Sequence, residues 1–346
     1  MRRRASGTVA LVAVALALTG WAPAVAGQEA APPRTPDGKP DLQGVWSFST
    51  ITPLERPEEL ADQAFLTAEE AAELEAETAA GRVDAPPPPG CPGGYNQFWF
   101  DPGTEVVGDR RTSLIVDPPN GRLPALQPGV PQGEMLPDDG SVVASPEARP
   151  VRFRAGGVGY DGPEDRGLAE RCILGFNTGP PMLPSGFYND YMQLFQGPDH
   201  VAILNEMVHD ARIIPLDGRE QLPGDVRQWM GSSRGHWEGD TLVITSTNFS
   251  DRTAGFNTSV ISGVGTGETL HLVERFTRVD ADTLLYEFTV DDPATYTRPF
   301  TVAVPMTRTD APLFEYACHE GNYGLLNILR GARAEEREAA AETEQP

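Results

Sequence analysis

Residues 270–306 read LHLVERFTRVDADTLLYEFTVDDPATYTRPFTVAVPM and carry the clearest secondary-structure pattern in the chain. Large apolar side chains stand at every second position in two parts of it: Leu284, Tyr286, Phe288 and Val290, and then Phe300, Val302, Val304 and Met306. A period of two places such side chains on one face of a β-strand. Turn residues at 280–282 and 291–293 separate the apolar runs. We therefore expect antiparallel strands at 270–279, 283–290 and 300–306.

Similar short apolar runs lie on both sides of this stretch, with turn residues between them. They occur at 191–196, 201–208, 212–216, 235–237, 241–247 and 313–318. The 36 Gly and 33 Pro among 346 residues also favour turns and short strands over a helical bundle. The pattern predicts a mainly β fold of about eight core strands joined mostly by short loops. An antiparallel meander closing into a lipocalin-like barrel would leave no sheet edge, and a β-sandwich is the alternative.

The N-terminus has the three parts of a secretory signal peptide, at residues 1–26. An arginine cluster at 2–4 precedes an apolar run at 9–18, and Ala-Val-Ala at 24–26 offers a cleavage site. The apolar run is shorter than a stable membrane span, although an uncut anchor is the alternative. We expect an exported protein, periplasmic or extracellular, with no transmembrane segment in its mature chain.

The rest of the chain divides by composition. A helix is expected at 67–80, because Thr67 and Glu70 form a capping box ahead of good helix formers. Strands are expected at 42–48 and 112–116. The predicted parts are a flexible mature N-terminus at 27–40, an irregular wrapping region with a few strands and one helix at 41–184, an antiparallel β-barrel core at 185–322, and a C-terminal helix docked by its first two turns, with a charged tail, at 323–346.

Acidic residues outnumber basic ones by 50 to 27, so the formal net charge is −23. Such a charge argues against a protein that binds nucleic acid or an anionic membrane surface. The sequence contains no phosphate-binding P-loop, and no motif indicates a cofactor.

Three cysteines are present, Cys91, Cys172 and Cys318. An oxidising compartment favours one disulfide and one remaining thiol. Cys172 and Cys318 each lie beside a predicted ordered segment, whereas Cys91 follows four consecutive prolines, so we expect the Cys172–Cys318 disulfide. A pair between Cys91 and Cys172 is the alternative. In the chain-entropy model, the expected bond stabilises the fold by roughly 4–5 kcal/mol.

Four segments form a distinctive set of motifs. They are NEMVHDARIIPLDGR at 205–219, GHWEGDTLV at 235–243, LVERFTRVD at 272–280 and YACHEGN at 316–322. Together they resemble a large uncharacterised family of exported bacterial proteins. The resemblance covers most of the mature chain and implies export, but it implies no particular reaction. Separately, Gly44-Val45-Trp46 is similar to the G-x-W motif of lipocalins, which agrees with a barrel.

Glu274, His209 and His319 are the candidate catalytic residues. Glu274 stands on an otherwise apolar strand face, where an unpaired carboxylate is costly to bury. It is either ion-paired, with Arg212 or Arg278 as the partner, or a general acid or base facing a cavity. The two histidines are its candidate proton partners. In the alternative interpretation they only bond to backbone carbonyls at strand ends.

Four further residues are candidates for binding a ligand. They are Glu206, Arg212, Trp237 and Glu320. A metal site would require His209, His271, His319 and Glu274 to converge from separate strands. We assign no metal, because no His-x-His or H-E-x-x-H spacing is present.

The leading functional hypothesis is an exported protein that binds a small, largely apolar molecule in the barrel interior. The first alternative is a secreted enzyme that acts on a small molecule through a His/Glu acid–base site. The second is an envelope interaction protein without a small ligand. A bell-shaped pH dependence would distinguish the enzyme from simple apolar binding.

Overall fold

The computed structural model describes residues 32–82, 100–135, 142–144, 159–175, 178–252, 254–259 and 262–343. The expected signal peptide, the first part of the expected flexible N-terminus and Cys91 lie outside these residues. Among the described helices, none combines the length and the apolar character needed to span a membrane.

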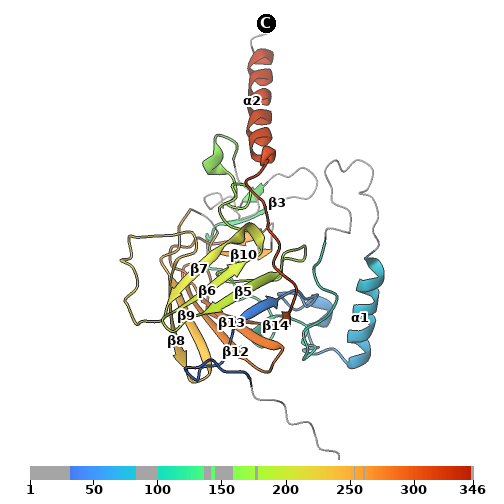
Figure 1. The fold of residues 1–346 in the computed structure, drawn as a ribbon. Helices are drawn as coiled ribbons and strands as arrows, with labels where there is room; N and C mark the ends of the chain where they lie inside the picture. Colours follow the sequence, from blue (N-terminus) through green and yellow to red (C-terminus); the bar gives the residue numbers. More distant parts are fainter. Residues whose placement is uncertain are drawn as a thin grey trace, which may run out of the picture. The chain divides into compact units, whose positions relative to one another are not determined.

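The fold is mainly β and is built on one ten-stranded sheet (Figure 1). Its strand order is β7-β6-β5-β1-β14-β13-β12-β9-β8, with β2 pairing to β14 outside this path, and all ladders are antiparallel. The strands are β1 (Gly44–Ser47), β2 (Ile115–Asp117), β5 (Tyr191–Gln196), β6 (His200–Asn205), β7 (Ala211–Pro215), β8 (Ser232–Glu238), β9 (Thr241–Thr247), β12 (His271–Arg278), β13 (Thr283–Asp291) and β14 (Phe300–Thr309).

The predicted alternation in β12, β13 and β14 is confirmed. Every second residue of β13 is buried from Leu284 to Val290, and Tyr286 stands opposite Phe276 and Val304 on the two neighbouring strands. Trp46 of β1 joins the same buried cluster. One face of the sheet therefore carries the main hydrophobic core.

The sheet curls so that its two edge strands, β7 and β8, approach each other (Figure 1). Side chains meet there: Arg212 of β7 donates to the Ser233 hydroxyl of β8 at 3.2 Å, and Gly235 leaves room for Ile214 and Leu216. No backbone ladder joins the two edges within the described residues, so no closed barrel is found. Side-chain contacts, and not backbone hydrogen bonds, therefore join the two edge strands.

A second, four-stranded sheet has the order β10-β11-β3-β4. Its strands are β3 (Gln132–Met135), β4 (Val142–Ala144), β10 (Phe256–Ser259) and β11 (Ser262–Val264). This sheet, like the large one, combines strands from both sides of residue 185. Each sheet therefore contains strands from both the expected wrapping region and the expected β core.

Helix α1 (Ala68–Gly81) begins as predicted, with Thr67 and Glu70 forming a capping box. Helix α2 (Tyr323–Thr343) follows the last strand, and none of its residues is buried. The C-terminal helix is thus confirmed, whereas the burial expected for its first two turns is not seen. Short 3-10 helices are η1 (Glu58–Leu60), η3 (Pro163–Asp165) and η4 (Met207–His209).

The strand expected at 313–318 is not formed, and that prediction was wrong. Residues 310–322 instead form an extended strap between β14 and α2, along which Phe314 is 71% exposed. The Cys172–Cys318 disulfide, which confirms the predicted pairing, ties the strap to the loop around residue 172. Among the described residues, no strand pairs with the strap, and apolar residues alone do not make a strand.

Candidate functional site

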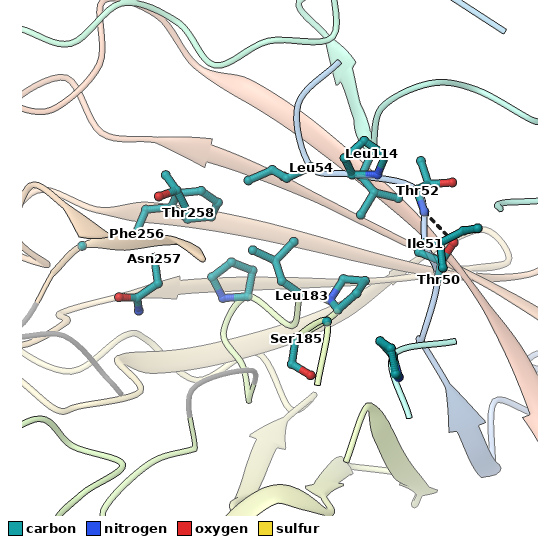
Figure 2. A pocket seen from close by; sticks show the side chains of 16 residues that line it. Thr50, Ile51, Thr52, Leu54, Leu114, Leu183, Ser185, Phe256, Asn257 and Thr258 are labelled. Atoms are coloured by element: carbon teal, nitrogen blue, oxygen red, sulfur yellow. Dashed lines mark hydrogen bonds between the residues drawn. The ribbon is translucent and has the colours of Figure 1, made fainter. Parts of the chain in front are cut away.

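A cavity of about 370 Å³ lies beside the core, where three parts of the chain meet (Figure 2). Leu114 and Phe256 contribute to both the core and the cavity wall. Leu54 and Leu183 point into the space from two sides (Figure 2). The lining residues are 50–54 with Pro102 and Leu114, Pro181 with 183–186, and 255–258.

None of the 16 residues that line this cavity is charged. Several of their polar atoms already have partners: the Thr50 hydroxyl donates to the Glu105 carbonyl at 2.8 Å, and Thr52 Oγ1 accepts the Val107 N–H at 3.0 Å. The side-chain amide of Asn257 has no hydrogen-bond partner in the described part of the chain. The cavity therefore offers apolar surface together with one free carboxamide.

Backbone hydrogen bonds fix the segments that form this cavity. The Leu114 N–H donates to the Pro53 carbonyl at 2.8 Å, and the Ile51 N–H donates to the Glu105 carbonyl at 3.0 Å. Gly103 has φ +84°, and a Cβ there would lie 2.9 Å from the Thr50 nitrogen. Glycine is therefore required for the chain to pass so close to the cavity rim.

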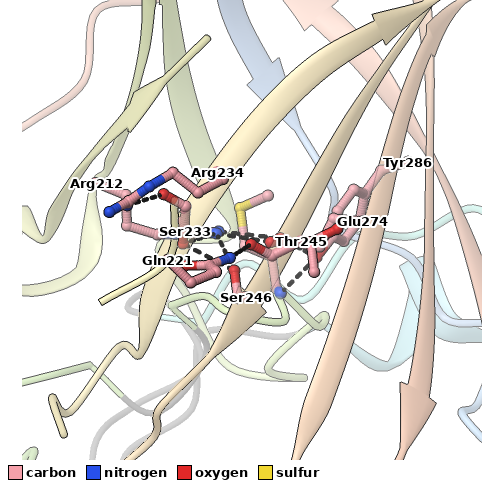
Figure 3. Close-up of polar contacts among 9 residues, drawn as sticks. Arg212, Gln221, Ser233, Arg234, Thr245, Ser246, Glu274 and Tyr286 are labelled. Atoms are coloured by element: carbon pink, nitrogen blue, oxygen red, sulfur yellow. Dashed lines mark hydrogen bonds and ion pairs between the residues drawn. The ribbon is translucent and has the colours of Figure 1, made fainter. Parts of the chain in front are cut away.

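A buried ion pair, Arg212–Glu274, lies in the core between β7 and β12 (Figure 3). Arg212 Nη1 and Nη2 donate to Glu274 Oε1 and Oε2 at 2.9 and 2.6 Å, which is a bidentate geometry. The exposed fractions of the two side chains are 3% and 0%. Of the partners left open by the sequence, Arg212 is the one that pairs with Glu274. Arg278 instead donates to backbone carbonyls and stacks on Trp46.

Three hydroxyl groups extend this ion pair into a network. The Tyr286 hydroxyl donates to Glu274 Oε1 at 2.9 Å and accepts the Met182 N–H at 3.1 Å. The hydroxyls of Ser233 and Ser246 lie 2.7 Å apart, and Ser233 accepts from Arg212 Nη2. Strands β7, β8, β9, β12 and β13 are joined through this network (Figure 3).

Burial and the charge of Glu274 act in opposite directions on the pKa of Arg212 and in the same direction on the pKa of Tyr286. Desolvation favours the neutral form of Arg212, but the charge and hydrogen bonds of Glu274 outweigh it, so the pKa of Arg212 is raised. Desolvation is the main cause that raises the pKa of Tyr286 well above its usual value, and the Glu274 charge adds to it. Tyr286 is therefore a neutral hydroxyl that can donate one hydrogen bond and accept another.

Of the three candidate catalytic residues, the structure describes the side chains of Glu274 and His319, which lie in different surroundings. Glu274 is fully buried and both of its oxygens are bonded to Arg212 and Tyr286, whereas His319 is exposed on the strap. His209 belongs to η4, but its side chain lies outside the described part of the chain. The geometry of Glu274 favours the ion-pair interpretation, and an acid–base role for these residues stays a prediction.

The expected ligand-binding residues have other partners or lie apart. Arg212 belongs to the buried ion pair, and Glu206 Oε1 accepts the N–H of Phe314 on the strap at 2.9 Å. The Lys39 ammonium lies over the ring of Trp237, 5.4 Å from the ring centre. Glu320 is exposed. Within the described ranges, no cluster of three or more His, Cys, Asp or Glu side chains could hold a metal ion.

No family model, curated protein or solved structure matches this chain. The resemblance to a family of exported bacterial proteins therefore stays an expectation. Two features of the described structure stand out: the uncharged cavity and the buried network around Arg212 and Glu274.

Proposed function

We propose that the protein binds a small, uncharged and largely apolar molecule in the cavity at 50–54, 181–186 and 255–258. The observation that carries this proposal is the absence of charge among the 16 lining residues. The chain as a whole has 27 basic and 50 acidic residues, so a wall of this size without any charge is distinctive.

The size of the cavity agrees with this function. A volume of about 370 Å³ lies within the range of pockets that enclose small organic ligands. The inward face of the large sheet is filled by its own side chains, including Trp46, Phe276 and Tyr286, all fully buried. We therefore propose that the ligand binds in the cavity beside the core and not in a barrel interior. The curled, barrel-like sheet supports this cavity.

The polar features of the cavity indicate what the ligand carries. The Asn257 amide can both donate and accept a hydrogen bond, which suits a carbonyl or hydroxyl group on an otherwise apolar molecule. A net charge of −23 disfavours an anionic ligand, because the field of the protein repels it. We further propose, from residues 1–26 of the sequence, that this binding takes place after export.

A pair of fluorescent probes with the same ring system tests the proposal. N-phenyl-1-naphthylamine is uncharged, and 1-anilinonaphthalene-8-sulfonate adds a sulfonate to it. We expect saturable binding of the uncharged probe and clearly weaker binding of the anionic one. The Leu183→Trp variant fills the cavity and should weaken binding of the uncharged probe at least about tenfold, which corresponds to about 1.4 kcal/mol.

The matched control is Ile213→Trp, since Ile213 is 71% exposed on β7 and does not line the cavity. This variant also adds an indole to an apolar position and should bind the uncharged probe as the unmodified protein does. Equal binding by Leu183→Trp and the unmodified protein would refute the cavity as the binding site.

A further inference from the structure

The segment 178–186, here called the wall segment, connects the cavity to the buried network. Five of its residues line the cavity: Pro181, Leu183, Pro184, Ser185 and Gly186. Met182 lies between them and is fully buried in the core. The wall segment therefore contacts the proposed binding cavity through some of its residues and the hydrophobic core through Met182.

Two buried side chains hold the backbone of the wall segment. The Met182 N–H donates to the Tyr286 hydroxyl at 3.1 Å. Three residues further on, the Ser185 N–H donates to Asp190 Oδ1 and Oδ2 at 2.9 and 3.1 Å, and Asp190 is fully buried. Leu183 and Pro184, which face the cavity, lie between these two anchors.

The wall segment also passes very close to the ion pair. A Cβ at Gly179 would lie 3.3 Å from Arg212 Nη1 and 3.1 Å from Met182 Cγ. The prolines at 180, 181 and 184 have fixed φ angles and no N–H, so few donors remain to fasten this backbone. The bonds from Met182 and Ser185 therefore fasten the part of the wall segment that lines the cavity, whereas its start is fastened by the Thr178 hydroxyl, which donates to Asp210 Oδ2 at 2.9 Å.

The orientation of the Tyr286 hydroxyl is set by its second hydrogen bond, the one to Glu274. Its proton goes to Glu274 Oε1, and Arg212 holds that carboxylate in a bidentate pair. With the proton directed to Glu274, the hydroxyl oxygen presents a lone pair to the Met182 N–H. The order of contacts is thus Arg212, Glu274, Tyr286, Met182 and then the cavity lining.

We propose that Tyr286 is a positioning residue for ligand binding: through the Met182 N–H its hydroxyl holds the cavity wall in its binding shape. This inference rests on the proposed function of the cavity. Tyr286 does not itself line the cavity, so it acts on the ligand through the wall segment. A preorganised wall strengthens binding, because less conformational freedom is lost when the ligand enters.

The test compares two variants that each remove one buried tyrosine hydroxyl. Tyr286→Phe removes the hydrogen bond that the Tyr286 hydroxyl accepts from the Met182 N–H, together with the one that it donates to Glu274. Tyr296→Phe is the matched control, because the Tyr296 hydroxyl is buried without a hydrogen-bond partner in the described part of the chain and does not line the cavity. For each variant we would measure affinity for N-phenyl-1-naphthylamine well below the unfolding temperature, and hydrogen–deuterium exchange of peptides covering 178–189 without any probe.

We expect Tyr286→Phe to weaken probe binding about five- to tenfold and to speed exchange in the wall segment, as befits the loss of one anchoring hydrogen bond. Tyr296→Phe should change neither. Unchanged exchange in Tyr286→Phe would overturn the positioning role, and faster exchange with unchanged affinity would overturn its link to binding. If the unmodified protein binds no probe, the proposed function fails together with that link, while the exchange measurement still decides whether Tyr286 holds the wall.

Discussion

Replacing Glu274 with Gln removes the negative charge from the buried pair with Arg212 and keeps the shape of the side chain. Both Glu274 oxygens accept hydrogen bonds, two from Arg212 and one from Tyr286. A Gln side chain has one oxygen and one amide nitrogen, so a donor would face a donor in at least one of these contacts. The charge of Arg212 would remain, 3% exposed and without its counter-charge.

The size of the effect follows from this burial. Removing one partner of a buried pair typically costs about 3–5 kcal/mol, because the remaining charge is left desolvated. We expect Glu274→Gln to lower the free energy of unfolding by about this amount, a large part of the total stability of an ordinary domain. Replacing both Arg212 and Glu274 with Leu should cost less than the sum of the two single replacements, since no charge is then stranded.

The assay is chemical unfolding in urea, followed by tryptophan fluorescence and circular dichroism. Glu287→Gln on the neighbouring strand β13 is the control, because Glu287 is only partly buried and alternates with the inward-facing residues. It should change the free energy of unfolding by less than about 0.5 kcal/mol. A Glu274→Gln protein as stable as the unmodified one would refute the structural role of the ion pair. Loss of a catalytic activity at unchanged stability would favour the acid–base interpretation.

Two further predictions concern high pH and the disulfide. Burial raises the pKa of Tyr191 to about 12, and burial also raises the pKa values of Tyr286 and Tyr296. The unfolded chain loses these protons first, so the melting temperature should fall as the pH rises from about 10 to 12; a constant melting temperature there would contradict this. Replacing Cys318 with Ser opens the bond to Cys172 and should lower the free energy of unfolding by about 2–5 kcal/mol. Guanidinium unfolding measures this loss, and an unchanged midpoint would count against it.

Local patterns in the sequence were enough to predict the best-defined elements. The alternation in 283–290 and 300–306 predicted β13 and β14, and the capping box at Thr67 and Glu70 predicted the start of α1. The place of β1 in the sheet could not be predicted. It pairs with β5 and β14, far away in sequence, and no local signal records such a pairing.

The candidate site was only partly predictable for the same reason. A carboxylate on an apolar strand face identified Glu274 as unusual, but the choice between Arg212 and Arg278 as its partner depends on how the sheet curls. The cavity left no motif at all. It arises where 50–54, 181–186 and 255–258 meet, and only the absence of charge in those three segments could have drawn attention to them.

The position of β1 has a consequence for the order in which the chain folds. Gly44–Ser47 emerges early in synthesis, yet one of its two partner strands, β14, ends only at Thr309. The sheet therefore cannot be completed until almost the whole chain is available, and contacts this distant in sequence slow folding. We proposed above that the chain is exported, and such a delay would be useful if export occurs in the unfolded state. The polypeptide would then stay extended while it crosses the membrane, and folding would be completed only on the far side.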